Sequence, residues 1–552
     1  MTTSSRLIVV SNRLPIALAR KGGSYVVSGS SGGLVTALSA VFRRYEGCWI
    51  GWPGSEYSPA VEDLLRSVPN LEFQVHPVFL TEEERQKFYS GFSNEIMWPL
   101  FHDLQSRCNF HPDYWDSYLA INNRFAERIA EVANENDFIW VHDYHLTAVA
   151  TSLRRIGRRS TLAYFQHIPF PSPDIFEKLP WRAELLDSML DFDLVGLQTR
   201  RDRKNFVVCV DRFVPQAKIT SSGGRTIVEH AGRKTVVGDF PIGIDFDEFS
   251  SEAASSEVAA LAAQIRADMH GRSLVLGVDR LDYTKGLPEK FRAFCHMLES
   301  CPHLRRNVTF VQVVVPSRED IPKYDELKRE IERLSGEING RFTDSGWSPI
   351  HFIYRRLERK QLLAYYRAAD VALVTPLKDG MNLVAKEYCA AHIGGQGVLL
   401  LSEFAGAAAE LACGALLVNP NDVVGVAKAL QTAILMNRNE RMQRMQTLRR
   451  AVQNADVYHW VQDFLEASGG VMQAKEALAD AAARAPGKQA KRAASVASNL
   501  RALARGATSA FSAMLAKGAT NHRAPLAHSD AGYDFQRAIT DYRPIVSRFD
   551  VA

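Results

Sequence analysis

The sequence lacks the features that would place it in a membrane or secretory class. Its 552 residues contain no run of about 18 apolar residues that could cross a membrane as a helix. The first fifteen residues, MTTSSRLIVVSNRLP, put polar residues and an arginine where a signal peptide has a continuous apolar stretch. These absences predict a cytoplasmic protein.

Cysteine is scarce and irregularly spaced. The seven cysteines are odd in number and form no C-x-x-C pair; they stand at positions 48, 108, 209, 295, 301, 389 and 413. This pattern argues against a disulfide framework or a zinc ribbon. It favours reduced thiols in a cytoplasm.

Most of the chain has no excess of either charge. The whole sequence carries a net charge of +4, but residues 481–552 alone carry +7 and the first 480 residues carry −3. The first 480 residues are therefore near neutral and lack the excess of positive charge that is typical of nucleic-acid-binding proteins.

The remaining pattern is that of a large α/β protein. Single hydrophobic cores stop growing near about 250–300 residues, so 552 residues require more than one domain. Short β-rich apolar runs alternate with longer helical patterns such as 114–133, 257–268 and 321–335. This alternation predicts two doubly wound, Rossmann-like parallel sheets, and ligands of such sheets bind at the carboxyl ends of the strands.

Three regions follow from the pattern. The pattern at 226–240 predicts a β-hairpin. It leads into PIGIDFDEF, whose Pro-x-Gly suits a linker, so we place a boundary near residue 243. We predict an N-terminal domain at 1–243 and a C-terminal domain at 244–473, with its last helix packing back on the first domain. Residues 474–552 form an Ala-rich basic tail, read as weakly structured and solvated; an assembly or nucleoid-adhering segment is the alternative.

The stretch VALVTPLKDGMNLVAKEY (371–388) is the most informative one. A buried strand runs into the turn Lys378-Asp379-Gly380 and then into a helix beginning near Met381. The free N–H groups and positive dipole of a helix N-terminus suit a phosphate. Glu387, two turns further on, could reach the ribose of a sugar nucleotide. The alternative is an ordinary strand–turn–helix with a surface glutamate.

A second loop, GVDRLDYTKGLPEK (277–290), places Arg280 and Lys285 just past another strand. Two cations at a strand end could neutralise a diphosphate leaving group. A basic pair that only flanks a helix is the plainer interpretation.

Further candidates follow other strands. Arg13 ends the first strand, and Gly32-Gly33 could let a backbone approach a ligand, although the dinucleotide spacing G-x-G-x-x-G is absent. Arg318 follows the strand in VVVPSRED. Tyr89 and Trp98 lie in an aromatic segment that is either core or a sugar-stacking surface.

Two motifs invite other functions. One is the H-x-x-H pattern of residues 142–145, which has only one nearby carboxylate and therefore too few ligands for a catalytic zinc site. We prefer the interpretation that Asp143 and His167 line a sugar site. DFDLV (191–195) matches the aspartyl-phosphate pattern D-x-D-x-[TV], but its strand follows the motif instead of preceding it, so we interpret it as structural.

Together these motifs resemble the trehalose-6-phosphate synthases, retaining glucosyltransferases with the two-domain GT-B fold. The resemblance covers about residues 6–470 and rests on long motifs in order: VSNRLP, FSNEIMWP, WVHDYHL, HIPFPSP, GVDRLDYTKGLPE, PSRED, INGRF, GWSPI, PLKDGMNLVAKEY and LSEFAGAAAEL. It implies a GT-B fold with two Rossmann-like domains facing across a cleft.

The resemblance also implies roles at matching positions. The residues implied to bind the UDP-glucose donor are Gly33, His167, Arg280, Lys285, Leu357, Asp379, Gly380, Met381, Asn382, Leu383 and Glu387. Those implied to bind glucose 6-phosphate are Arg13, Tyr89, Trp98, Asp143 and Arg318. The residues implied to take part in catalysis are Asp143, His167, Arg280 and Lys285.

The expected reaction joins UDP-glucose and glucose 6-phosphate into trehalose 6-phosphate and UDP. Double displacement needs two carboxyl groups about 5 Å apart, and the motifs offer no such pair, so a front-face route is expected. We expect no cofactor, no required metal, no nucleic-acid or membrane partner, and a homo-oligomer (dimer or tetramer). The alternatives are a same-family synthase with another acceptor, such as a glucosylglycerol-phosphate synthase or an aminocyclitol-coupling relative, and a non-catalytic sugar-phosphate sensor.

Overall fold

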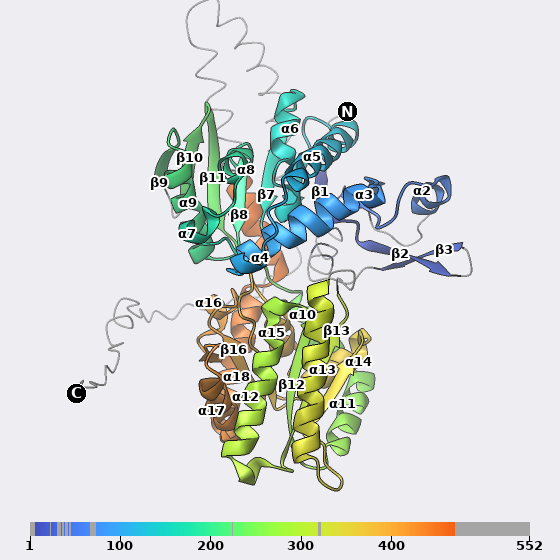
Figure 1. Cartoon of the computed structure of the whole chain (residues 1–552), viewed down its shortest axis with the longest axis vertical. Helices are drawn as coiled ribbons and strands as arrows, with labels where there is room; N and C mark the ends of the chain where they lie inside the picture. Colours follow the sequence, from blue (N-terminus) through green and yellow to red (C-terminus); the bar gives the residue numbers. More distant parts are fainter. Residues whose placement is uncertain are drawn as a thin grey trace, which may run out of the picture.

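The computed structural model describes residues 6–21, 24–29, 35, 38, 42, 46–66, 73–222, 225–317 and 322–469. Two α/β domains lie end to end, the N-terminal one above the C-terminal one in Figure 1. Each is built on a mainly parallel sheet, as the sequence predicts. Among the described residues, no helix is both long and apolar enough to cross a membrane.

The N-terminal domain is organised around a sheet in which nine strands are described. Their order across the sheet is β5-β4-β1-β6-β7-β8-β11-β10-β9. The strands are β1 (Leu7–Arg13), β4 (Gly47–Trp52), β5 (Gln74–Pro77), β6 (Phe138–His142), β7 (Thr161–Phe165), β8 (Leu194–Leu197), β9 (Lys218–Ser222), β10 (Arg225–His230) and β11 (Arg233–Asp239). The first seven strands in this order, from β5 to β11, pair in parallel. Strand β10 pairs antiparallel with β11, which is the hairpin predicted at 226–240, and β9 adds antiparallel to β10.

A separate two-stranded ribbon and several helices complete this domain. The ribbon is β2 (Ile16–Lys21) with β3 (Ser24–Gly29), which project from the body in Figure 1. The helices are α2 (Pro59–Arg66), α3 (Glu82–Glu84), the π-helix η1 (Arg85–Met97), α4 (Trp98–Phe101), η2 (Gln105–Arg107), α5 (Pro112–Val132), η3 (Tyr144–Leu146), α6 (Val149–Arg155), α7 (Pro173–Phe176), α8 (Arg182–Met189) and α9 (Arg200–Phe213). The ribbon, β5 and β9 carry too little apolar periodicity to be expected from sequence.

The C-terminal domain has a parallel sheet in the order β14-β13-β12-β15-β16-β17. Its strands are β12 (Ser273–Arg280), β13 (Val308–Val315), β14 (Ile350–Tyr354), β15 (Val371–Val374), β16 (Val398–Ser402) and β17 (Leu416–Val418). Its helices are α10 (Phe246–Ala254), α11 (Ser256–Asp268), η4 (Tyr283–Lys285), α12 (Leu287–Ser300), η5 (Pro302–Leu304), α13 (Pro322–Phe342), α14 (Arg359–Ala368), α15 (Leu383–Ala391), α16 (Ala408–Leu411), α17 (Val423–Leu435) and α18 (Arg438–Asn454).

The central strands of both sheets are apolar on both faces. Every residue of β6, β8, β15 and β16 is buried. A parallel strand with helices on both faces has no solvent side, so its sequence reads as a continuous apolar run. Short apolar runs in the sequence therefore coincide with these four strands.

Both sheets contain a point where the strand order reverses. It lies between β1 and β6 in the first sheet and between β12 and β15 in the second. Ligands of doubly wound sheets bind outside the carboxyl ends of the strands at this point. The residues that follow β1, β6, β12 and β15 are therefore the first place to look for a site.

The chain passes between the domains twice, and the two passages touch. Val457 donates its N–H to the carbonyl of Ile244 at 3.0 Å. A Cβ on Gly243 would lie 2.3 Å from the carbonyl carbon of Asp456, so only glycine fits there. The helix at 457–469 then lies on the N-terminal domain, where Phe464 stacks on Trp140 with ring centroids 4.5 Å apart.

Gly243→Ala should destabilise the protein, because the new methyl group meets backbone and cannot be relieved by a side-chain rotation. We expect a loss of about 1–3 kcal/mol, the usual effect of overpacking. Equilibrium urea unfolding followed by tryptophan fluorescence measures it.

Gly336→Ala is the matched control. A Cβ at Gly336 meets nothing within 4 Å, and the residue lies inside α13, where alanine should add about 0.5–1 kcal/mol. Equal effects at both glycines would show that the contact between the two passages is unimportant.

Candidate functional site

Three N-terminal strands end next to one another and present polar residues. In the sheet, Ser11 of β1 pairs with His142 of β6, which pairs with Phe165 of β7. Arg13, Asp143 and His167 follow at this same edge. The sheet thus brings together three residues that are 24 or more positions apart in sequence, as their strand-end positions predict.

Arg13 ends β1 and lies on an aromatic platform. Its guanidinium carbon is 4.3 Å from the ring centroid of Trp52. Trp52 is in turn 6.1 Å from the ring of Tyr89, and Tyr89 stacks on His145 at 5.8 Å with an interplanar angle of 12°. Arg13 is exposed to solvent at this edge of the sheet. A cation fixed in orientation and open to solvent can bind an anionic ligand.

Asp143 has an unusual backbone conformation. Its φ is +74° and its ψ is 165°, a region that residues other than glycine rarely adopt. The conformation is held because its N–H donates to the carbonyl of Phe165 at 2.8 Å, while its Oδ1 accepts the N–H of His167 at 3.2 Å. Strain of this kind is retained where a side chain must be aimed.

Two histidines form a hydrogen-bonded pair behind this edge. His142 Nδ1 lies 3.1 Å from His167 Nε2. Burial lowers the pKa of His167 to about 3, and burial together with the neighbouring His167 lowers the pKa of His142 well below its ordinary value. Both rings are therefore neutral at physiological pH.

The C-terminal domain contributes a charged cluster after β15. Lys285 Nζ donates to Asp379 Oδ2 at 2.5 Å, and Asn382 Nδ2 donates to the same oxygen at 3.0 Å. Burial alone would raise the pKa of Asp379, but the Lys285 ammonium outweighs burial and lowers it. The carboxylate is therefore ionised and fixed.

Asn382 also starts the helix. It adopts a left-handed conformation (φ 80°), and its side chain caps α15 by accepting the N–H of Ala385 at 3.2 Å. The helix begins at Leu383, two residues later than the sequence suggested, because Asn382 forms the cap. Its N-terminus faces the loop that holds Asp379, as an anion site requires.

The two domains meet at Gly380. A Cβ there would lie 2.0 Å from the carbonyl oxygen of His167, so this loop packs directly on the N-terminal site. The carbonyl of Gly380 in turn leaves no room for a Cβ on Gly406. Residues predicted from two separate motifs are thus brought into contact.

Arg280, at the end of β12, also reaches across the junction. Its guanidinium lies 5.6 Å from the ring centroid of Trp98 and 3.9 Å from Asp282. Its side chain is 48 % exposed. Trp98 is buried beneath it and touches His102 and Tyr144.

The other predicted donor residues that the structure describes lie in the C-terminal domain. Glu387 accepts the hydroxyl of Tyr366 at 2.9 Å, and burial raises the pKa of Glu387. Leu357 and Met381 are buried. Gly33 and Arg318 lie outside the described residues.

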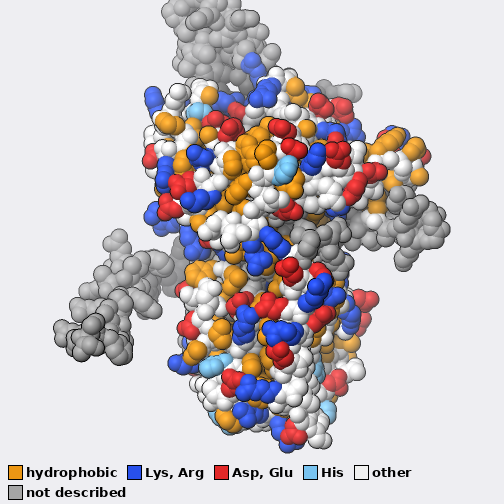
Figure 2. Space-filling view, viewed as in Figure 1, with side chains coloured by type: hydrophobic (Ala, Val, Ile, Leu, Met, Phe, Trp, Pro, Cys, Tyr) orange, Lys and Arg blue, Asp and Glu red, His pale blue; other side chains and the backbone are white. Residues whose placement is uncertain are grey.

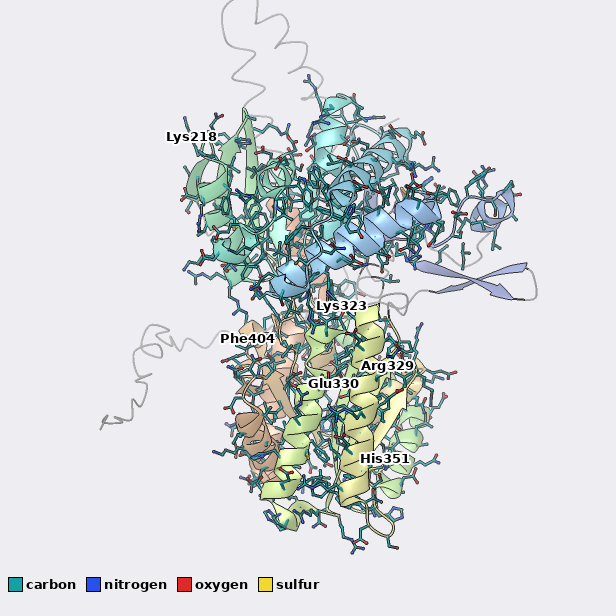
Figure 3. All side chains as sticks on the ribbon, in the orientation of Figure 1. Lys218, Lys323, Arg329, Glu330, His351 and Phe404 are labelled. Carbon is teal, nitrogen blue, oxygen red and sulfur yellow. The ribbon has the colours of Figure 1, made fainter. Side chains whose placement is uncertain are left out.

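Sequence reasoning missed a set of contacts between the domains. Lys378 pairs with Asp103 at 2.6 Å, Lys323 donates to the carbonyl of Arg107 at 2.8 Å, and Arg107 lies 4.7 Å from the ring of Tyr283. Figure 3 shows Lys323 at the junction, and Figure 2 shows Lys and Arg side chains gathered there. Nothing in the local sequence marks residues 102–107, because their partners are more than 170 positions away.

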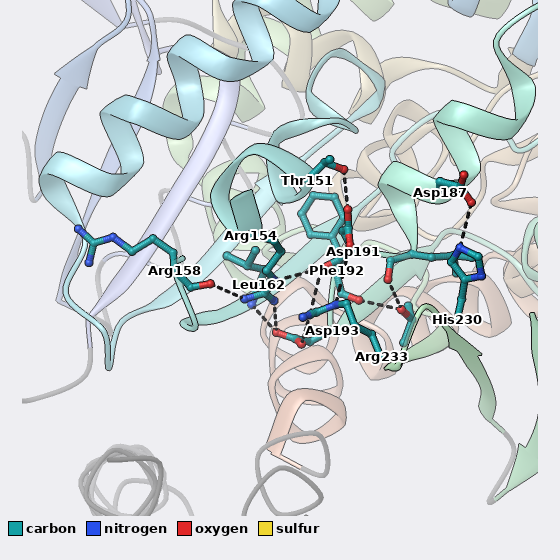
Figure 4. A network of polar contacts seen from close by, with 12 residues as sticks. Thr151, Arg154, Arg158, Leu162, Asp187, Asp191, Phe192, Asp193, His230 and Arg233 are labelled. Atoms are coloured by element: carbon teal, nitrogen blue, oxygen red, sulfur yellow. Dashed lines mark hydrogen bonds and ion pairs between the residues drawn. The ribbon is translucent and has the colours of Figure 1, made fainter. Parts of the chain in front are cut away.

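The DFDLV motif is structural. Asp193 accepts hydrogen bonds from Arg154 at 2.9 Å, from Arg233 at 3.1 Å and from the N–H of Leu162 at 2.9 Å, as Figure 4 shows. The carboxylate is buried and fully engaged. It holds β7, β8 and β11 together, while Asp191, the first aspartate of the motif, accepts the hydroxyl of Thr151 at 2.7 Å.

Within the described ranges, no group of three or more His, Cys, Asp or Glu residues has the arrangement of a metal site. The seven cysteines are all free thiols.

Known proteins resemble the chain over the part that contains both sheets. The sequence model of glycosyltransferase family 20 matches residues 5–468. A trehalose-6-phosphate synthase of Mycolicibacterium smegmatis is 42% identical over 473 residues, which is 84% of this chain and 92% of that protein. The corresponding protein of Mycobacterium avium is 40% identical over 479 residues, 84% of this chain and 95% of that one.

Solved structures agree in fold. A UDP-forming trehalose-phosphate synthase of Burkholderia xenovorans, bound to glucose 6-phosphate, matches with a TM-score of 0.76 and 35% identity, covering 84% of this chain and all (100%) of that one. The E. coli enzyme bound to UDP-2-fluoro glucose matches with a TM-score of 0.76 and 35% identity, covering 84% and 99%. The fold is of the GT-B type, as predicted.

The neutral histidine pair should make stability depend on pH. Their pKa values are lower in the folded protein than the unfolded value of about 6.5, so stability is complete above that pH and is lost as pH falls. Between pH 7 and pH 5.5, the free energy of unfolding should therefore fall by about 1 kcal/mol less in His167→Phe than in the wild type. Urea unfolding at the two pH values measures it.

Exposed His303→Asn provides the control for this measurement. If the wild type and His167→Phe lose the same free energy between the two pH values, the ring is not held neutral in the folded state.

Proposed function

The chain belongs to glycosyltransferase family 20, and we propose that it transfers glucose from UDP-glucose to glucose 6-phosphate, releasing trehalose 6-phosphate and UDP. The observation that carries this proposal is the meeting of the Lys285–Asp379–Asn382 cluster with His167 through Gly380. In this proposal, the start of α15 binds phosphate and faces the same reaction centre as the polar strand ends of the N-terminal domain.

The donor binds on the C-terminal domain in this proposal. The diphosphate lies at the start of α15, next to Arg280 and Lys285, and the ribose hydroxyls reach Glu387. Glu387 is a hydrogen-bond acceptor already held by Tyr366, which fixes its orientation. The backbone at Leu357 contacts the uracil, as the family resemblance implies. Gly33, Gly380, Met381 and Leu383 complete the donor surface.

The acceptor binds on the N-terminal side. Its phosphate lies against Arg13 and Arg318, and its sugar against Tyr89, Trp98 and Asp143. The solved relative from Burkholderia xenovorans binds glucose 6-phosphate, which supports a phosphorylated hexose as acceptor. Arginine suits phosphate because its planar fork donates two parallel hydrogen bonds.

The transfer retains configuration by a front-face route. The acceptor hydroxyl oxygen bonds to C1 of glucose on the side that UDP leaves, the C1–O bond to UDP breaks, and the hydroxyl proton passes to a diphosphate oxygen. A solved relative, 35% identical over 84% of this chain and with a TM-score of 0.75, is described for glycosyl transfer with retention by a trehalose-6-phosphate synthase.

The chain's own residues then position the reactants and stabilise charge. Arg280 and Lys285 meet the negative charge that develops on UDP, and the neutral His167 can donate or accept a hydrogen bond without adding charge. Asp143 holds an acceptor hydroxyl in place. Such positioning supplies most of the rate in a bimolecular transfer.

The same cations make a metal unnecessary in this proposal. We expect EDTA to leave turnover unchanged, because Arg280, Lys285 and the α15 dipole already offset the leaving diphosphate. Turnover in purified enzyme with and without EDTA, then with added Mg²⁺, measures this. Loss of activity that Mg²⁺ restores would contradict it.

The other expectations remain predictions. A cytoplasmic location accords with the free thiols, and a homo-oligomer is expected from the family resemblance. A synthase with another acceptor is not favoured, because the trehalose-6-phosphate synthases above match 84% of the chain at 40–42% identity. A sensor without activity is disfavoured because Arg280, Lys285, Asp379 and Glu387 are all present.

Arg280→Ala should lower kcat/KM by roughly 10–150-fold, since a charge-assisted contact to the leaving group contributes about 1.5–3 kcal/mol. Coupled detection of UDP release measures it. Arg329→Ala, which removes an exposed arginine from α13, is the control and should leave turnover unchanged. Near-wild-type activity in Arg280→Ala would move the diphosphate elsewhere.

The kcat/KM for glucose 6-phosphate should be at least about 100-fold higher than for glucose. Glucose has no phosphate to pair with the acceptor arginines, and the lost hydrogen bonds correspond to about 3 kcal/mol. Parallel assays with glucose 6-phosphate, glucose and glycerol 3-phosphate, with the product identified by mass, test this.

Arg318→Ala and Arg13→Ala should each reduce this preference and spare UDP-glucose binding. A higher rate with glycerol 3-phosphate, or a loss confined to the donor, would overturn the acceptor assignment.

A further inference from the structure

His142 is the last residue of β6, and the proposed chemistry leaves it without a role. It is fully buried, and its ring lies behind His167, with ring centroids 5.3 Å apart. Its Nδ1 is 3.1 Å from His167 Nε2, so one of these atoms donates a hydrogen bond to the other. The direction of that bond fixes which nitrogen of His167 carries its proton.

The surroundings of His142 decide the direction. The rings around it are Trp140 at 4.7 Å, Phe165 at 6.3 Å and Trp460 at 6.5 Å. Among the described residues, His142 Nε2 is buried without a hydrogen-bond partner, and so are the Nε1 atoms of Trp140 and Trp460. An indole nitrogen can only donate, so in the described part of the chain no acceptor lies within hydrogen-bond reach of these three nitrogens.

If His142 Nε2 carried the proton, it would be a buried N–H without an acceptor, next to the two indole N–H groups that also lack one. An unprotonated Nε2 can instead accept from a neighbouring indole through a buried water. Orphaned buried N–H groups are rarer than orphaned acceptors. The proton of neutral His142 then sits on Nδ1 and is donated to His167 Nε2.

We propose that His142 is a positioning residue that fixes His167 in its Nδ1-protonated form, so that His167 offers an N–H donor to an oxygen of the donor hexose. The inference rests on the proposed function for the identity of that ligand. It explains why a histidine, and not an apolar residue, ends a strand that is otherwise buried among aromatic rings.

Other elements support the same geometry. The backbone N–H of His167 donates to Asp143 Oδ1. The carbonyl of His167 lies so close to Gly380 that no Cβ would fit on Gly380. The backbone of His167 is thus fixed on both sides, and only the ring tautomer is left for His142 to set. Trp460 comes from the helix at 457–469, so the second passage of the chain also builds this pocket.

Two substitutions separate positioning from packing. His142→Phe keeps a ring in the pocket but removes the Nδ1 donor. His142→Asn places an amide N–H near the former Nδ1 and can donate to His167 again. We expect His142→Phe to lower kcat by about 10–100-fold with UDP affinity unchanged, and His142→Asn to restore most of the loss.

The tautomer itself can be observed without turnover. In protein with ¹⁵N-labelled histidine, long-range ¹H–¹⁵N spectra show which ring nitrogen is protonated, and His167→Gln assigns the His167 signals. We expect Nδ1–H in the wild type and in His142→Asn, and a shift toward Nε2–H in His142→Phe.

The outcomes distinguish this inference from the proposed function. A wild type that makes no trehalose 6-phosphate but shows Nδ1–H at His167 would contradict the function and leave the hydrogen-bond direction standing. An active wild type with Nε2–H at His167, or a His142→Phe variant with wild-type kcat, would overturn the positioning role. Equal losses in His142→Phe and His142→Asn, with weaker UDP binding, would show that His142 only packs.

Discussion

Parallel pairing of strands is the constraint on which the site depends. All carboxyl ends of a parallel sheet lie at one edge, so residues that follow β1, β6 and β7 become neighbours although the sequence separates them. The second sheet does the same for Arg280 and Asp379. The strand order reverses once in each sheet, and these two points supply the polar residues at the junction.

Close contact between the domains depends on small residues and on paired charges. Gly380 lets a loop of one domain lie on the carbonyl of His167 in the other, and Gly243 lets the two passages of the chain touch. The Lys285–Asp379 pair is mostly buried and shares its carboxylate with Asn382. A buried charge pair is costly to desolvate, so its place at the helix start where we propose that the donor binds is better explained by binding than by stability.

The aromatic residues serve two purposes that the sequence could not separate. Phe88 and Phe92 of η1 are fully buried core residues. Tyr89 of the same helix instead lies 6.1 Å from the ring of Trp52, which carries Arg13, and Trp98, the next residue after η1, lies 5.6 Å from Arg280. The π-helical winding of η1 changes which side chains share a face, so a period of 3.6 residues misassigns them. The polar network of Asp193 shows the opposite case, in which a catalytic-looking motif only joins strands.

The sequence by itself determined the α/β class, the central strands and the motifs at their ends, because buried parallel strands are continuous apolar runs and their following loops are polar. It also indicated Arg280, Lys285 and Asp379 as a phosphate site. It did not reveal the short edge strands β5 and β9, the ribbon, or the late start of α15 at its Asn382 cap. Only the tertiary structure placed Lys378 against Asp103, Gly380 against His167 and His142 behind His167, because each of these contacts joins segments whose separation in the chain leaves no local pattern.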